Sequence, residues 1–164
     1  MADAYVTALK MLARRELSEA QVRTRLARRE FESGAIDQAV ARLQAARALD
    51  DRRTALACAR TEAHVKRHGR LRALRTVEAL GIDRGVARTA VAEVFDEVDE
   101  DALIAQALDR KLRPPTRKAS ARQRGAAEAA EARRLYRYLL AQGFDAGRVH
   151  AAIRSRIKNA LHDE

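Results

Sequence analysis

Apolar residues recur along this chain at helical spacing, and the same arrangement returns three times. The anchor positions are Phe31, Ile82 and Phe144, and each lies between two helical runs. Apolar residues lie five and nine positions before each anchor, and five and nine positions after it. Five positions before the anchors are Leu26, Val77 and Leu139, and nine before are Val22, Ala73 and Leu135. Five positions after the anchors are Ile36, Ala87 and Val149, and nine after are Val40, Val91 and Ile153. Such self-similarity predicts repeated units that bury their apolar faces partly against their neighbours.

The central copy defines the unit. Residues 70–80 form a basic helical run, Gly81-Ile82-Asp83 a corner, and residues 84–95 a second helical run. Gly81 suits the left-handed residue just past a helix end, and Asp83 can accept hydrogen bonds from the free N–H groups that open the next helix. Because no strand period occurs anywhere, the pattern predicts an all-α chain of three similar modules.

Helix start and stop signals place the boundaries. Ser18 and Gln21 form a capping-box signature, Asp50-Asp51 and Asp145 are further caps, and Pro114-Pro115 stops a helix. The expected modules are residues 1–49, 50–98 and 99–164, with an exposed basic linker over 114–125. The expected helices are 5–15, 18–29, 34–48, a run from 51 toward 69, 70–80, 84–95, a run from about 99 to 112, 126–142, and a last helix from 146 that frays after 157.

Composition narrows the class. The chain is 47% hydrophobic with 4% aromatic residues and no Trp, so the core must consist mostly of Ala, Leu and Val. One cysteine, Cys58, excludes an internal disulfide. No run approaches the ~18 apolar residues of a membrane span, and the N-terminus lacks a signal-peptide layout. We therefore expect a cytoplasmic protein without a membrane partner.

The net charge of +10 predicts attraction to a polyanion, and nucleic acid is the first candidate. The middle helix of each module carries clustered cations, which could follow a phosphate backbone. The alternative is a solvated face with ion pairs to Glu19, Glu30, Glu78 or Glu131. The candidate binding residues are Arg60, Lys66, Arg67, Arg70, Arg72, Arg75, Arg133, Arg134 and Arg137, with Arg23, Arg25, Arg28 and Arg29 in the first module. Since aromatic stacking residues are scarce, binding to bare single-stranded DNA should be weak, salt-sensitive and non-specific.

No pattern indicates catalysis. The chain has no P-loop, no dinucleotide-binding glycine pattern, and no nucleophile with a positioned base. His64 and His68 have the spacing of two metal ligands, with Cys58 near them, but no second ligand cluster completes a site. We expect no enzyme, metal or cofactor. Five carboxylates between 96 and 101 indicate a capped junction between modules or, alternatively, a docking site for a basic partner.

A series of short segments recurs here in a characteristic order: Leu9, Leu12-Ala13-Arg14-Arg15, Ser18-Glu19, Leu26 to Phe31, Leu49-Asp50-Asp51, Arg53, Arg110-Lys111, Pro114-Pro115, Tyr138-Leu139-Leu140 and Gly143-Phe144. Their order and spacing resemble the RecX family, the regulators of the RecA recombinase. The resemblance implies an elongated, curved array of three tandem three-helix modules that lies along the groove of the RecA filament on single-stranded DNA. It also implies modulation, most often inhibition, of the ATPase, strand-exchange and coprotease activities of RecA. We expect the protein to be a monomer.

The central module departs from that family pattern. Thr54 and Cys58 stand where aromatic residues are usual, Glu62 replaces a common Arg, and Arg70 replaces a Pro. Leu74 also competes with Ala73 as the apolar anchor of the middle helix. The rival function is a free-standing helix-turn-helix DNA-binding protein, although the helices after the corners are poor in base-reading Asn, Gln and Ser.

Overall fold

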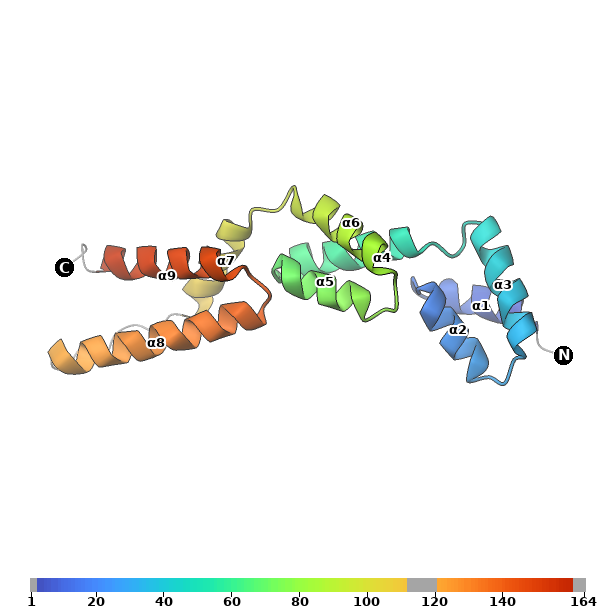
Figure 1. Ribbon diagram of the computed structural model, residues 1–164, viewed down its shortest axis with the longest axis horizontal. Coiled ribbons are helices and arrows are strands. Elements are labelled where there is room, and N and C mark those ends of the chain that lie inside the picture. Colours follow the sequence, from blue (N-terminus) through green and yellow to red (C-terminus); the bar gives the residue numbers. More distant parts are fainter. Residues whose placement is uncertain (1–2, 112–120, 161–164) are drawn as a thin grey trace.

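The computed structural model describes residues 3–111 and 121–160, and this part of the chain is helical with no strand (Figure 1). The helices form an elongated array, with α1 and α9 at opposite ends. No described helix has the length and apolar character needed to cross a bilayer. The elements are α1 (Ala4–Leu12), α2 (Glu19–Ala27), α3 (Ser33–Ala45), α4 (Asp51–Arg60), the π-helical turn η1 (Thr61–Val65), α5 (Arg70–Glu78), α6 (Arg84–Phe95), α7 (Glu100–Lys111), α8 (Ala121–Ala141) and α9 (Ala146–Ala160).

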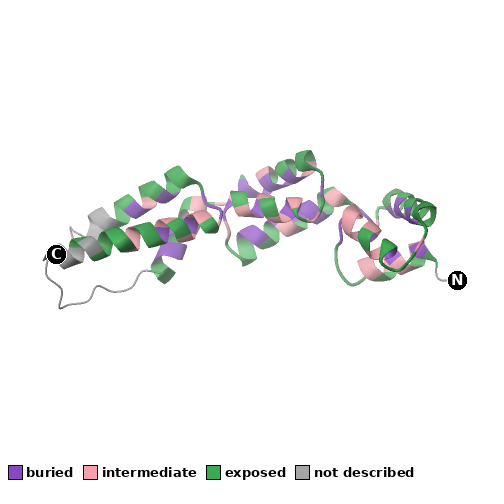
Figure 2. Ribbon diagram, turned by 60° about the horizontal axis from the view of Figure 1, so that its bottom comes forward, coloured by how far each residue is buried: buried purple, intermediate pink, exposed green. Residues whose placement is uncertain are grey.

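Three separate clusters of buried side chains form the core (Figure 2). One joins α1, α2 and α3, the next α4, η1, α5 and α6, and the last α7, α8 and α9; we call these groups the first, central and third modules. Each cluster consists mainly of Ala, Val, Leu and Ile. The expected all-α array of three tandem three-helix modules is confirmed.

The apolar positions aligned in the sequence lie inside these cores. Every residue five or nine positions from an anchor is buried, including Ala73, which settles the register of α5 against Leu74. Two of the anchors are buried as well, Ile82 and Phe144. Phe31 is only half-buried, so the first corner contributes less apolar burial than the other two.

The three corners share one backbone conformation. The residue before each anchor is left-handed, with φ of 62° at Glu30, 78° at Gly81 and 88° at Gly143. At the first and third corners the next amide donates to a carbonyl of the preceding helix: Phe31 N–H to Leu26 O at 3.4 Å, and Phe144 N–H to Leu139 O at 3.3 Å. Glu30 adopts a conformation that costs a residue with a Cβ roughly 1 kcal/mol, because the repeat geometry requires it there.

The predicted caps are also present. Ser18 and Gln21 form the capping box of α2, and the Asp50 carboxylate accepts from Arg53 N–H at 3.0 Å. At the other corners Asp83 accepts from Gly85 N–H at 2.8 Å, and Asp145 accepts from Arg148 N–H at 3.0 Å. Each cap lies where the sequence signals placed it.

Several sequence predictions were wrong in detail. Helix α8 begins at Ala121, not at 126, because its alanine-, arginine- and glutamate-rich start favours helix despite Gly125. The end of the predicted linker 114–125 is therefore helical; its residues 114–120 lie outside the described part. Helix α9 is regular to Ala160, beyond its expected fraying point.

Two apolar residues whose helical spacing predicts burial are exposed. Val6 lies one helical turn before Leu9, which predicts a buried stripe, but Val6 is 44% exposed, and Ala4 and Ala8 are buried instead. Small residues at these positions let α1 pack closely in its module. The apolar spacing of the run from 51 toward 69 also predicts a buried Val65, but Val65 is 76% exposed, and Glu62 and Ala63 are buried in that region. In a helix, the residues three and four positions after buried Ala59 lie on the same face as Ala59, and these are Glu62 and Ala63. Val65 lies on a different face.

The unequal corners give a stability prediction. Phe144→Ala should lower the free energy of unfolding by roughly 3–5 kcal/mol, because Phe144 is 1% exposed in the third core. Phe31→Ala should cost about half as much. Urea denaturation of both variants measures the difference, and an equal loss at both corners would contradict the burial argument.

Candidate functional site

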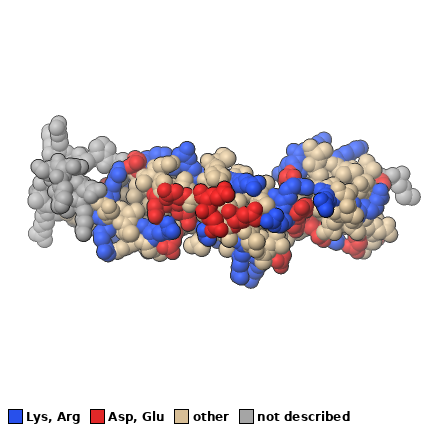
Figure 3. Space-filling view, turned by 90° about the horizontal axis from the view of Figure 1, so that it is seen from above, with Lys and Arg blue, Asp and Glu red and all other residues tan. Residues whose placement is uncertain are grey.

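Charge is unevenly distributed along the array. Figure 3 shows an acidic patch on the face above the α6–α7 connection. Its exposed members are Asp96, Glu97, Asp99 and Asp101. The negative charge of this face would repel phosphate groups.

The acidic residues act at the boundary between the central and third modules. Asp99 accepts a hydrogen bond from Ala102 N–H at 2.9 Å, which caps the start of α7, and Asp101 pairs with Arg148 at 3.0 Å. Glu100 accepts from Arg70 N–H at 3.0 Å. These contacts confirm the junction interpretation of this acidic stretch.

Neighbouring modules are joined through the ends of their middle helices. At the first junction the Ser18 hydroxyl, at the start of α2, donates to Leu80 O at the end of α5. A Cβ on Gly81 would lie 2.6 Å from the Cβ of Ala20, which shows how closely the two helix ends approach. Asp51 accepts from Glu19 N–H at 2.8 Å.

The second junction repeats this arrangement. At the start of α5, Gly69 N–H donates to Gln142 O at 2.9 Å and Leu71 N–H donates to Gly143 O at 3.1 Å. A Cβ on Gly143 would lie 2.3 Å from the Arg72 backbone nitrogen, so this close approach requires glycine. Helices α2, α5 and α8 therefore form a head-to-tail column in which the positive N-terminal end of one helix faces the negative C-terminal end of the next.

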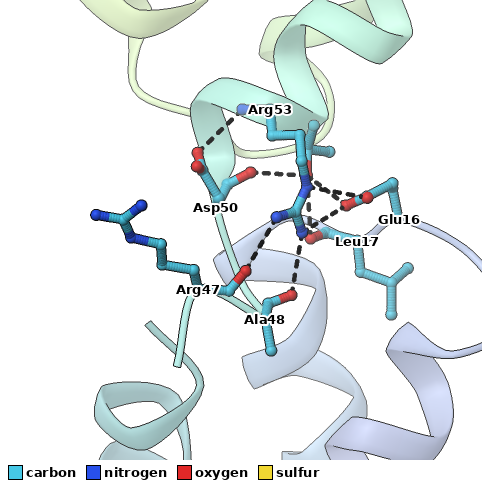
Figure 4. A network of polar contacts seen from close by, with 7 residues as sticks. Glu16, Leu17, Arg47, Ala48, Asp50 and Arg53 are labelled. Atoms are coloured by element: carbon cyan, nitrogen blue, oxygen red, sulfur yellow. Dashed lines mark hydrogen bonds and ion pairs between the residues drawn. The ribbon is translucent and has the colours of Figure 1, made fainter. Parts of the chain in front are cut away.

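A polar network reinforces the first junction (Figure 4). The Arg53 guanidinium pairs with Glu16 at 3.0 Å and donates to Arg47 O at 2.9 Å and Ala48 O at 3.2 Å. The Thr54 hydroxyl donates to Asp50 O at 3.0 Å. Arg53 thus ties the end of α3 and the α1–α2 connection to the start of α4.

Four predicted cations of the central module are engaged within the chain. The guanidinium of Arg72 donates to Ala141 O at 3.2 Å, at the C-terminal end of α8, and Arg67 donates to Gln106 Oε1 at 2.6 Å. Arg70 lies 3.8 Å from Asp96, and Lys66 pairs with Glu62 at 2.6 Å. The interpretation of these residues as one open cationic surface does not account for these contacts.

The other predicted cations differ in their surroundings. Arg60 and Arg75 are exposed, and neither has a carboxylate within 4.0 Å in the described part of the chain. In the third module Arg134 pairs with Glu131 at 2.9 Å, whereas Arg133 and Arg137 border a groove between α8 and α9.

The first module carries a cationic cluster of its own. Burial, followed by the positive charges of Arg15 and Arg28, lowers the pKa of the Arg25 guanidinium. These three residues therefore lie close enough to repel one another. Arg23 differs, because Glu19 at 2.7 Å and Asp37 at 2.6 Å neutralise it.

The π-helical turn buries an ionised network. Glu62, fully buried, accepts from Lys66 Nζ at 2.6 Å and lies 2.6 Å from His68 Nδ1. Burial alone would raise the pKa of Glu62, but the hydrogen bonds and charges of His68 and Lys66 outweigh it and lower that pKa. His68 is thus committed to Glu62, and His64 is exposed. Within the described ranges no group of His, Cys, Asp and Glu could hold a metal ion.

The comparisons with known proteins agree on one family. The sequence model described as RecX, first three-helix domain, matches residues 4–43. A protein named regulatory protein RecX from Pelodictyon phaeoclathratiforme is 27% identical over 161 residues, which cover 98% of this chain and 93% of that protein. A protein of the same name from Chlorobaculum tepidum is 29% identical over 157 residues, which cover 96% of this chain and 88% of that protein. The crystal structure of RecX from Lactobacillus salivarius has the same fold, with a TM-score of 0.73, 18% identity and 93% of each chain covered.

The second junction can be tested at its glycine. Gly143→Ala should lower the free energy of unfolding by about 2 kcal/mol or more, because φ is +88° and the new Cβ would meet the Arg72 backbone. Gly34→Ala is the matched control, since nothing lies within 4 Å of a Cβ there. Denaturation and hydrogen exchange of the amides of residues 69–72 measure the effect; a Gly143→Ala variant as stable as the control would refute the docking.

The buried network can be tested by pH. Since the pKa of Glu62 in the folded chain lies below its ordinary value of 4.5, its ionisation stabilises the fold above about pH 4.5. That contribution is lost as pH falls through the lower, folded-state pKa. Glu62→Gln should cost about 1–3 kcal/mol at neutral pH and flatten the acid loss of stability. Glu93→Gln, at an exposed pair with Arg52, should change stability by less than about 1 kcal/mol in urea titrations at each pH.

Proposed function

We propose that this chain, which is similar to regulatory proteins named RecX, binds the filament that RecA forms on single-stranded DNA and inhibits RecA's ATPase, strand-exchange and coprotease activities. In this proposal it acts by binding alone, as a cytoplasmic monomer without metal or cofactor. The observation that carries it is the full-length similarity to RecX proteins together with an elongated array of the same fold.

We propose that the polyanion-facing residues lie on the first and central modules. We assign the contacts to five cations that have no carboxylate within 4.0 Å in the described part of these two modules: Arg15, Arg25, Arg28, Arg60 and Arg75. Phosphate contacts would relieve the repulsion that Arg15 and Arg28 exert on Arg25, and would release counterions from the DNA. Arg67, Arg70 and Arg72 would act indirectly, by holding the central and third modules in their relative orientation, and Lys66 by pairing with Glu62 inside the central module.

The central experiment is a RecA ATPase assay on single-stranded DNA. Wild-type protein should inhibit hydrolysis, and the double reversal Arg28→Glu with Arg75→Glu should require roughly tenfold more protein for equal inhibition, since two attractive contacts become repulsive. Both side chains are exposed, so the melting temperature should stay nearly unchanged. Arg84→Glu with Arg110→Glu gives the same net charge at exposed positions outside this set.

Three outcomes would overturn the proposal. Wild-type protein without effect on RecA would remove the function, and equal losses in the two double variants would remove the assigned surface. Tight, sequence-specific binding to duplex DNA would favour a helix-turn-helix DNA-binding protein. Binding to bare single-stranded DNA should instead weaken with salt, with a log–log slope of about −0.7 per phosphate neutralised.

A further inference from the structure

A groove with a volume of about 680 Å³ lies between α8 and α9. Ala132, Tyr136 and Ile153 give it an apolar floor. Arg133 and Arg137 lie along α8, and His150 and Arg154 along α9, each pair one helical turn apart. We propose that this groove binds an acidic amphipathic helix of a partner protein.

The shape of the groove suits a helix. Helices α8 and α9 diverge from their common corner (Figure 1) and line the groove between them. A third helix can pack its ridge of side chains into such a groove. The volume lies within the ~300–1,000 Å³ of ordinary ligand sites, enough for several apolar side chains. An amphipathic helix would insert apolar residues at i, i+3 or i+4, and i+7 along this floor.

The cations around the groove determine which charges the partner helix should carry. Carboxylates on both sides of the partner's apolar stripe would contact Arg133 and Arg137 on α8 and Arg154 on α9. The described residues supply no carboxylate within 4.0 Å of any of these three guanidinium groups. A basic or neutral helix would leave them uncompensated beside an apolar surface.

The first module shows a closed form of the same groove. Tyr136 and His150 each follow an aligned core residue, and the equivalent positions there hold Arg23 and Asp37. Those two side chains form an ion pair at 2.6 Å between α2 and α3. In the third module His150 stands in place of this carboxylate, and the described residues form a cation-lined apolar channel there. In our proposal the partner helix supplies the neutralising carboxylates.

Single-stranded nucleic acid fits the groove less well. Its bases require stacking surfaces, and the rings of Tyr136 and His150 are the two that line the groove, beside aliphatic Ala132 and Ile153. This docking site is independent of the proposed action on RecA, because the cations assigned to that action lie on other modules.

The test measures binding of a labelled synthetic helix to the full chain by fluorescence anisotropy. The probe has leucines on one face and glutamates on both flanks, and a second probe carries glutamine in place of glutamate. The acidic probe should bind at least roughly tenfold more tightly than the glutamine probe, and Arg133→Glu with Arg137→Glu should abolish that preference. Arg84→Glu with Arg110→Glu, equal in net charge, should retain it.

Four results would overturn the docking site. The first is failure of the acidic probe to bind, and the second is equal binding of both probes. The third is an equal loss of acidic-probe binding in the two double variants. The fourth is weaker oligonucleotide binding by the groove variant, Arg133→Glu with Arg137→Glu, when the acidic probe does not bind. Light scattering adds a check: a dimer that the groove reversal dissociates would identify a second copy as the occupant. The RecA assay on the same groove variant separates the two proposals, because inhibition should persist when only the peptide site is lost.

Discussion

The head-to-tail docking of α2, α5 and α8 is the contact on which the array depends. Each module has its own core, so the relative orientation of the modules must come from the few groups at these helix ends. At the second junction, backbone N–H groups at the start of α5 reach carbonyls at the end of α8, and at the first junction the Ser18 hydroxyl reaches Leu80 O. These bonds satisfy groups that the helix termini would otherwise leave unpaired. Gly143 is indispensable to this geometry, since the Arg72 backbone occupies the space of a Cβ.

The same docking explains why some cations have partners within the chain and others do not. A helix C-terminus carries partial negative charge, so an arginine at the start of the neighbouring helix is attracted to it, as Arg72 is to the end of α8. Arg70 lies near two carboxylates, Asp96 at the end of α6 and Glu100 at the start of α7. Net charge on a middle helix is therefore a poor guide to charge available for a partner. Of the central cluster, the residues away from the helix start, such as Arg75, are the ones left for external contacts.

Periodicity and local chemistry made most of the fold predictable. The aligned apolar positions, the caps at Ser18, Asp50, Asp83 and Asp145, and the left-handed Gly81 all follow from rules that act within one or two helical turns. The π-helical turn and the left-handed Glu30 could not be read this way, because packing imposes them on residues without a distinctive preference. The intrachain partners of Arg67 and Arg72 were hidden for a related reason, since they lie on elements far away in the sequence.

Comparing equivalent positions in the three modules gives information about surface side chains that the apolar periodicity alone does not give. Once the corners are superimposed in sequence, a position can be compared across modules that share its backbone setting but not its side chain. Arg23 and Asp37 close the first groove with an ion pair, while Tyr136 and His150 leave the third groove apolar and bordered by arginine. Burial of the aligned core residues is the same in both, so the difference contributes nothing to the common fold. A repeated scaffold can thus keep one core pattern and present a different surface from each module, and the surfaces that lack internal neutralisation are where partners should bind.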